Sequence, residues 1–82
     1  MDIEKMEAQL EVWNMTIERL AAKAVRARGQ ARIDFHYQVD DLKARHALAM
    51  ARLGEFRAAG DEEREDFRAS LEIAWADLEK AF

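Results

Sequence analysis

Few residues in the sequence have a type and spacing that could support catalysis or metal binding. His36 and Asp40 are four residues apart, so on a helix they would share a face and could contact a divalent ion or simply each other. Neither His36 nor His46 follows a Glu by three residues, so the Glu-x-x-His pattern of metal-binding helical bundles is absent. Ser70 is the only serine and has no histidine near it in the sequence. We therefore expect a non-enzymatic protein with no catalytic residues, no metal and no cofactor.

A basic block is the strongest candidate for binding chemistry. Residues 19–33 contain five basic residues and no acidic residue: Arg19, Lys23, Arg26, Arg28 and Arg32. Such a block could bind an anionic partner such as nucleic acid or lipid headgroups. The alternative is a solvated face whose arginine stems cover the core. Because the net charge of the chain is −4, we do not expect general affinity for nucleic acid.

The element that must position these residues is a long amphipathic helix. Apolar residues recur every three or four positions from Ile3 to Phe56. This is the heptad repeat with which helices bury a common seam, so we predict a helix over about 2–58. Asp2 is suited to be its N-cap. The predicted seam comprises Ile3, Met6, Leu10, Trp13, Ile17, Leu20, Ala24, Ala27, Ala31, Phe35, Val39, Leu42, His46, Leu53 and Phe56, and continues in the last helix with Phe67, Leu71 and Leu78.

The middle of this stretch has a changed pattern. The seam residues shrink to alanine at 24, 27 and 31, and the heptad slips by one residue after Ala31. A slip of this kind unwinds a supercoil locally without breaking the helix. Gly29 lowers helix stability by about 1 kcal/mol relative to Ala, but no Pro, Asn or Ser accompanies it. The pattern therefore favours a continuous helix, with a bend near Gly29 as the alternative.

A stronger break signal follows at Arg57–Asp61. Gly60 is suited to the left-handed conformation that ends helices, and Asp61 is suited to cap the next one. We expect a shorter helix over about 61–82 that folds back on the long one, because a charged helix of this length is marginal alone.

These elements allow two all-α architectures for a single domain over residues 1–82. In the favoured one, two straight long helices pair antiparallel as a coiled-coil homodimer. Each end then forms a three-helix bundle, and the basic block lies at the waist. In the alternative, the chain bends near Gly29 into a monomeric three-helix bundle. The favoured architecture makes a second copy of the chain the expected partner, and the sequence names no other protein partner.

Composition fits a small helical protein. The chain has 82 residues, no Pro and no Cys, and no apolar run approaches the roughly 20 residues that span a bilayer. The acidic, periodic N-terminal segment does not resemble a signal peptide. We expect a cytoplasmic location.

Several segments resemble a family of small, mostly uncharacterised bacterial coiled-coil proteins. The resemblance is carried by residues 6–14 (MEAQLEVWN), 17–24 (IERLAAKA), 38–45 (QVDDLKAR), 59–61 (AGD), 65–69 (EDFRA), 71–72 (LE) and 74–75 (AW). Members typically read MKAQLDEWNAEIDKLEAKA in the first region. The placement of Trp13-Asn14 and of Ala74-Trp75 adds weight.

The resemblance implies a coiled-coil protein without a known catalytic site. Some relatives are described as stress-induced, so it also implies a stress association. This chain departs from the family pattern at Gly29 and Gly54, and it has Ser70 where Gly is usual. Because the pattern lacks a glycine at the place of Gly29, the resemblance supports a continuous helix there.

Overall fold

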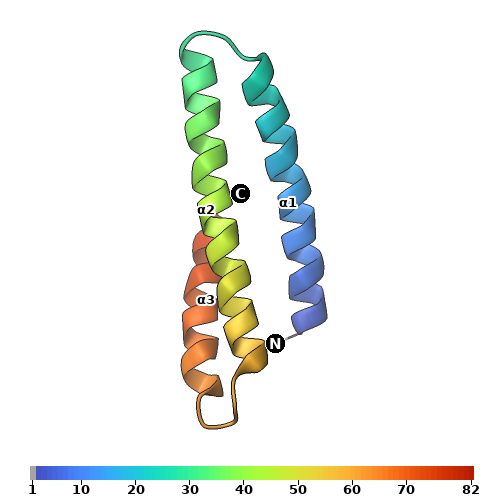
Figure 1. Cartoon of the computed structure of the whole chain (residues 1–82), viewed down its shortest axis with the longest axis vertical. Coiled ribbons are helices and arrows are strands. Elements are labelled where there is room, and N and C mark those ends of the chain that lie inside the picture. The colour runs from blue at the N-terminus through green and yellow to red at the C-terminus, as the bar shows by residue number, and fades with distance from the viewer. Residues whose placement is uncertain (1) are drawn as a thin grey trace. The chain divides into compact units, whose positions relative to one another are not determined.

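Three helices make up the part of the chain that the structure describes. The computed structural model describes residues 2–82, which form α1 (Ile3–Arg26), α2 (Gln30–Ala58) and α3 (Arg64–Lys80) and contain no strand (Figure 1). The all-α prediction is confirmed. The predicted continuous helix over about 2–58 is wrong, because α1 and α2 are separate helices. The alternative bend near Gly29 is confirmed.

Helix α1 starts at the predicted N-cap. The Asp2 carboxylate accepts a hydrogen bond of 3.1 Å from the backbone N–H of Lys5, which satisfies one of the free donors of the first turn. The last turn carries Lys23 and Arg26, which suit the negative end of the helix dipole. Charge and capping therefore match the observed helix, which ends at Arg26.

The chain reverses over Ala27–Gly29. Ala27 is extended, with ψ 155°, and its N–H still bonds to the carbonyl of Lys23 at 2.9 Å. Gly29 has φ +61°, in the left-handed region that side chains with a Cβ disfavour. The carbonyl of Gly29 then accepts the N–H of Arg32 at 3.2 Å as α2 begins. The extended Ala27 and the left-handed Gly29 therefore together separate α1 from α2.

The chain divides into two compact units, which share α2. The N-terminal unit ends at Ala44 and contains α1 with the first part of α2; the C-terminal unit, Arg45–Phe82, contains the rest of α2 with α3. Buried side chains follow helical spacing in both units. They are Leu10, Ile17, Ala24, Val39 and Leu42 in the first, and His46, Ala49, Leu53, Phe56, Leu71, Ala74 and Leu78 in the second.

The predicted seam residues are placed mostly inward. Ten are buried: Leu10, Ile17, Ala24, Val39, Leu42, His46, Leu53, Phe56, Leu71 and Leu78. Seven are half-buried: Ile3, Met6, Trp13, Leu20, Ala27, Phe35 and Phe67. Ala31 is exposed, because the reversal at Gly29 interrupts the phase that a continuous helix would have kept. A dimer seam through these residues stays a prediction.

Helix α3 starts three residues later than expected. Residues 61–63 form a turn in which the N–H groups of Glu63 and Arg64 both bond to the carbonyl of Gly60, at 3.1 and 3.0 Å. Glu63 occupies the cap position without a side-chain hydrogen bond, so the predicted Asp61 cap is wrong. Gly60 also lacks the expected positive φ; among residues 2–82 that torsion belongs to Gly29.

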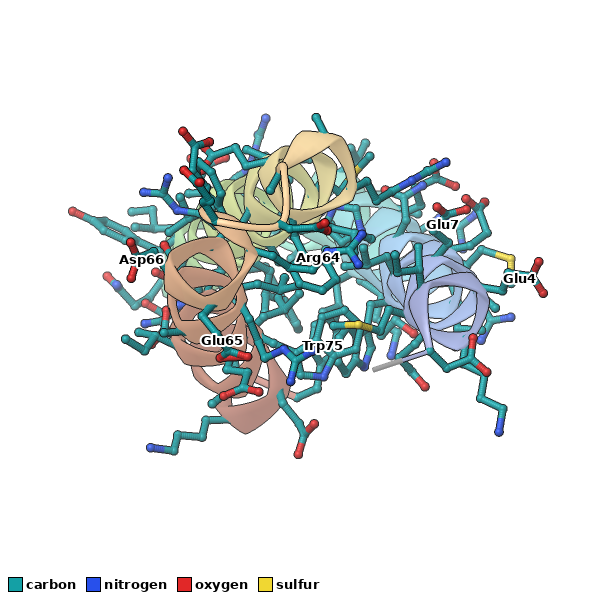
Figure 2. The ribbon with its side chains drawn as sticks, turned by 90° about the horizontal axis from the view of Figure 1, so that it is seen from below. Glu4, Glu7, Arg64, Glu65, Asp66 and Trp75 are labelled. Carbon is teal, nitrogen blue, oxygen red and sulfur yellow. The ribbon has the colours of Figure 1, made fainter. Side chains whose placement is uncertain are left out.

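Two kinds of contact join α2 and α3 within the C-terminal unit. Arg45 Nη1 lies 2.7 Å from Asp77 Oδ1. The guanidinium groups of Arg64 and Arg68 lie 5.4 and 5.9 Å from the centre of the Phe56 ring, within the range of cation–π attraction. Figure 2 labels Arg64, Glu65 and Asp66, the first three residues of α3; the two acidic side chains favour the first turn of this helix.

Two glycine-to-alanine substitutions test the reversal at Gly29, because they should change the free energy of unfolding in opposite directions. Gly29→Ala should lower the free energy of unfolding by about 1–2 kcal/mol, because alanine is strained at this torsion although nothing lies within 4 Å of the added Cβ. Gly54→Ala, in the interior of α2 and equally open, should raise it by about 0.5–1 kcal/mol. Urea unfolding followed by circular dichroism measures both. A straight helix would be stabilised by both changes, so a more stable Gly29→Ala contradicts the bend.

The core of the C-terminal unit can be tested on α3 alone. Leu71→Ala should lower the free energy of unfolding by about 2–5 kcal/mol, because the Leu71 side chain is fully buried. Ile73→Ala is the matched control: Ile73 is 72% exposed two residues away, so a change within about 0.5 kcal/mol is expected. Equal losses in urea unfolding would mean that α3 does not bury this face.

Candidate interaction surfaces

The structure does not bring His36, Asp40 and His46 together into a metal site. His36 and Asp40 are both exposed and lie one turn apart on α2, whereas His46 is buried. Over residues 2–82, no group of three or more His, Cys, Asp or Glu side chains is placed to hold a metal ion. None of the helices in this range is long and apolar enough to cross a membrane. The candidate functional sites are therefore the exposed surfaces of the helices.

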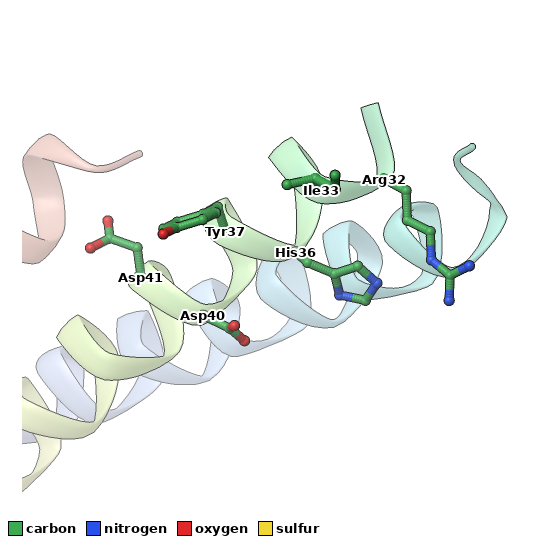
Figure 3. Close-up of a pocket in the computed structure, with 6 residues that line it drawn as sticks. All are labelled: Arg32, Ile33, His36, Tyr37, Asp40 and Asp41. Atoms are coloured by element: carbon green, nitrogen blue, oxygen red, sulfur yellow. The ribbon is translucent and has the colours of Figure 1, made fainter. Parts of the chain in front are cut away.

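One surface on α2 combines apolar and charged side chains. We define the α2 outer surface as the six residues that line an open depression of about 530 Å³: Arg32, Ile33, His36, Tyr37, Asp40 and Asp41 (Figure 3). Ile33 is 54% exposed and Tyr37 is 77% exposed. Exposure of two large apolar side chains one turn apart makes this a patch rather than a single exposed residue.

Helical spacing arranges these six residues in two neighbouring rows. One row reads Arg32, His36, Asp40 and the other reads Ile33, Tyr37, Asp41, each at intervals of four residues. Figure 3 shows Arg32 and His36 along one side of α2 and Ile33 and Tyr37 along the other side of the depression. The surface therefore runs from a basic end, through an aromatic and apolar middle, to an acidic end.

The sequence-based prediction missed this surface because it followed the heptad stripe alone. Ile33 and Tyr37 lie off that stripe, so they were assigned no role. The available signal was a second apolar pair at i,i+4 on the same helix, outside the phase set by Phe35, Val39 and Leu42. This pair therefore lies outside the buried face of α2.

The basic block lies at the turn between α1 and α2. All five members, Arg19, Lys23, Arg26, Arg28 and Arg32, are exposed. Lys23 and Arg26 belong to the last turn of α1, where the helix dipole favours positive charge. Arg32 lies in the first turn of α2, which contains no acidic residue and where the dipole disfavours positive charge. Helix stability thus explains Lys23 and Arg26 but not Arg32.

A second depression lies between α2 and α3 in the C-terminal unit. It has a volume of about 240 Å³ and is lined by Leu48, Arg52, Ser70, Ile73, Ala74 and Asp77. The apolar Ile73 is 72% exposed and Leu48 is 44% exposed. The charged groups at this site are engaged within the unit, since Arg52 bonds to Glu55 at 2.9 Å and Asp77 to Arg45 at 2.7 Å.

Comparisons with known proteins found no relative from which a function could be inferred. No protein-family model, no curated protein and no solved structure matches this chain. The resemblance to small bacterial coiled-coil proteins therefore stays a prediction. The fold and the α2 outer surface are the observations on which a function can be argued.

Proposed function

We propose that this chain is a non-enzymatic interaction protein that binds a protein partner through the exposed faces of its helices. The observation that carries the proposal is the α2 outer surface, where Ile33 and Tyr37 are exposed one turn apart between charged residues. An apolar centre with a polar rim is the usual anatomy of a protein–protein interface. Tyrosine is also among the residues that contribute most to such interfaces.

The small size of the chain also supports this proposal, because a small chain leaves apolar surface exposed that a partner could cover. An 82-residue chain buries a smaller fraction of its surface on folding than a larger domain does. Nine large apolar side chains in residues 2–82 are substantially exposed, among them Val25 at 73% and Met50 at 54%. Binding that covers part of this surface adds burial to a small core and stabilises the folded chain. The resemblance adds a stress-associated setting to the proposal.

Photo-crosslinking tests whether the α2 outer surface contacts a protein in the cell. Replacing Tyr37 by the photoreactive analogue p-benzoylphenylalanine should give discrete protein adducts on irradiation, because position 37 lies within the proposed contact. The same replacement at Gln38 is the matched control, since Gln38 is exposed but faces away from both rows of the surface. Denaturing gels and mass spectrometry then size and identify the adducts. Absence of adducts at position 37, or equal adducts at 37 and 38, would contradict the proposal.

A second candidate function is supported by the position of Arg32. We propose, as the alternative, that the basic block binds a phosphate-bearing partner, nucleic acid or lipid headgroups. Because Arg32 lies at the positive end of the α2 dipole, its charge there is unfavourable to the free protein. An anion bound beside Arg28 and Arg32 would relieve that repulsion at the N-terminus of α2.

Salt-dependent binding tests this alternative. Fluorescence anisotropy with a labelled 20-base-pair DNA duplex, and co-sedimentation with phosphatidylglycerol vesicles, should show binding that weakens as salt increases. The double variant Arg28→Ala/Arg32→Ala should weaken the complex and lower its salt dependence by about one ion per lost phosphate contact. Lys43→Ala/Lys80→Ala changes the net charge equally at exposed sites outside the block and is the control. No complex at low salt would exclude the alternative.

A further inference from the structure

We infer that the partner of the α2 outer surface is a second copy of the same chain, bound antiparallel about a two-fold axis that passes between the two His36–Tyr37 pairs. The inference rests on the proposed function and names its partner. It concerns a contact between outer faces of α2, which differs from the exchanged long-helix seam expected from the heptad pattern.

The spacing of the surface suits packing of one helix on an identical helix. Its two rows are ridges of residues at i and i+4. Ridges of this type from two helices interdigitate at a crossing angle of about −50°, the commonest class of helix packing. When both helices present the same ridges, the contact is self-complementary, as a two-fold interface requires.

Charge selects the antiparallel arrangement. With His36 facing its own symmetry mate, positions four residues to either side meet, so Arg32 of one copy lies opposite Asp40 of the other. The two-fold axis repeats the pair, which gives two attractive pairs in each dimer. A parallel arrangement would place Arg32 on Arg32 and Asp40 on Asp40, and like charges across an interface suppress the wrong orientation.

The apolar middle of the surface supplies burial between these charged ends. Tyr37, at 77% exposure, would face its own symmetry mate at the axis, and Ile33, at 54%, would lie one turn from that pair, opposite Asp41 of the other copy. The tyrosine can bury its ring and keep its hydroxyl at the rim in contact with water. A patch of six residues per copy is small for a stable interface, so we expect a dimer that dissociates on dilution.

Complementary charge reversal tests the geometry. Arg32→Glu alone would face Asp40 of the second copy, and Asp40→Lys alone would face its Arg32, so each variant should dimerise about tenfold more weakly or worse. An equimolar mixture of the two variants restores both opposite-charge pairs and should recover the dimer. Sedimentation equilibrium over a range of concentrations measures the mass, and circular dichroism confirms that each variant is folded.

An apolar substitution provides a second, independent readout. Tyr37→Ser should abolish the two-chain species, whereas Ile73→Ser, which removes an equally exposed apolar side chain from α3, should leave it unchanged. A wild-type chain that stays at one-chain mass at every concentration overturns the inference. So does a dimer that is unaffected by Arg32→Glu and Asp40→Lys, or a mixture that fails to restore it.

The outcome separates this inference from the broader proposal. A monomeric wild-type chain whose position 37 still crosslinks to a different protein would overturn the homodimer and keep the interaction function. A wild-type chain that is monomeric and also gives no adduct at position 37 would overturn both.

Discussion

The arrangement of α1 and α2 follows from the reversal of the chain at Gly29, whose backbone is left-handed. A φ of +61° at this residue lets the chain reverse within three residues, Ala27–Gly29. The reversal converts one heptad stripe into two helices, α1 and α2, that run antiparallel on either side of the turn (Figure 1). The reversal also brings basic residues to the turn, which is flanked by Lys23, Arg26, Arg28 and Arg32. A residue with a Cβ would disfavour this torsion, so the bend is tied to a single glycine.

Helix α2 contributes to both compact units and has two distinct faces. Its buried positions, from Val39 to Phe56, keep the three- and four-residue spacing of a core face. A second face carries Ile33 and Tyr37 between Arg32 and the aspartates. A helix that buries a single stripe would place polar residues on that second face. Folding of this chain does not explain the exposed Ile33–Tyr37 pair, whereas binding of a partner would.

Different forces hold and orient the C-terminal unit. Burial of Leu53, Phe56, Leu71 and Leu78 supplies the stability, because full burial of each side chain contributes about 1.5–3 kcal/mol. The Arg45–Asp77 pair is half-exposed and contributes on the order of 1 kcal/mol or less. Its effect is to favour one register of α3 against α2. The two arginines at Phe56 add attraction and cover the ring where the chain turns into α3.

The all-α class, the Asp2 cap, the break before the last helix and most of the buried positions could be predicted from the amino-acid sequence alone. These follow from local rules: apolar spacing, capping chemistry and the lack of proline. Whether the first 58 residues form one helix or two was decided by the tertiary structure, because the same heptad stripe serves a seam between chains and a core within one chain. The break depends on the backbone of Ala27–Gly29, where Ala27 is extended and Gly29 is left-handed, and apolar spacing does not encode these torsions. The same reversal exposed Ala31, and it left Ile33 and Tyr37 outside the core, since only packing determines which of two apolar faces a helix buries.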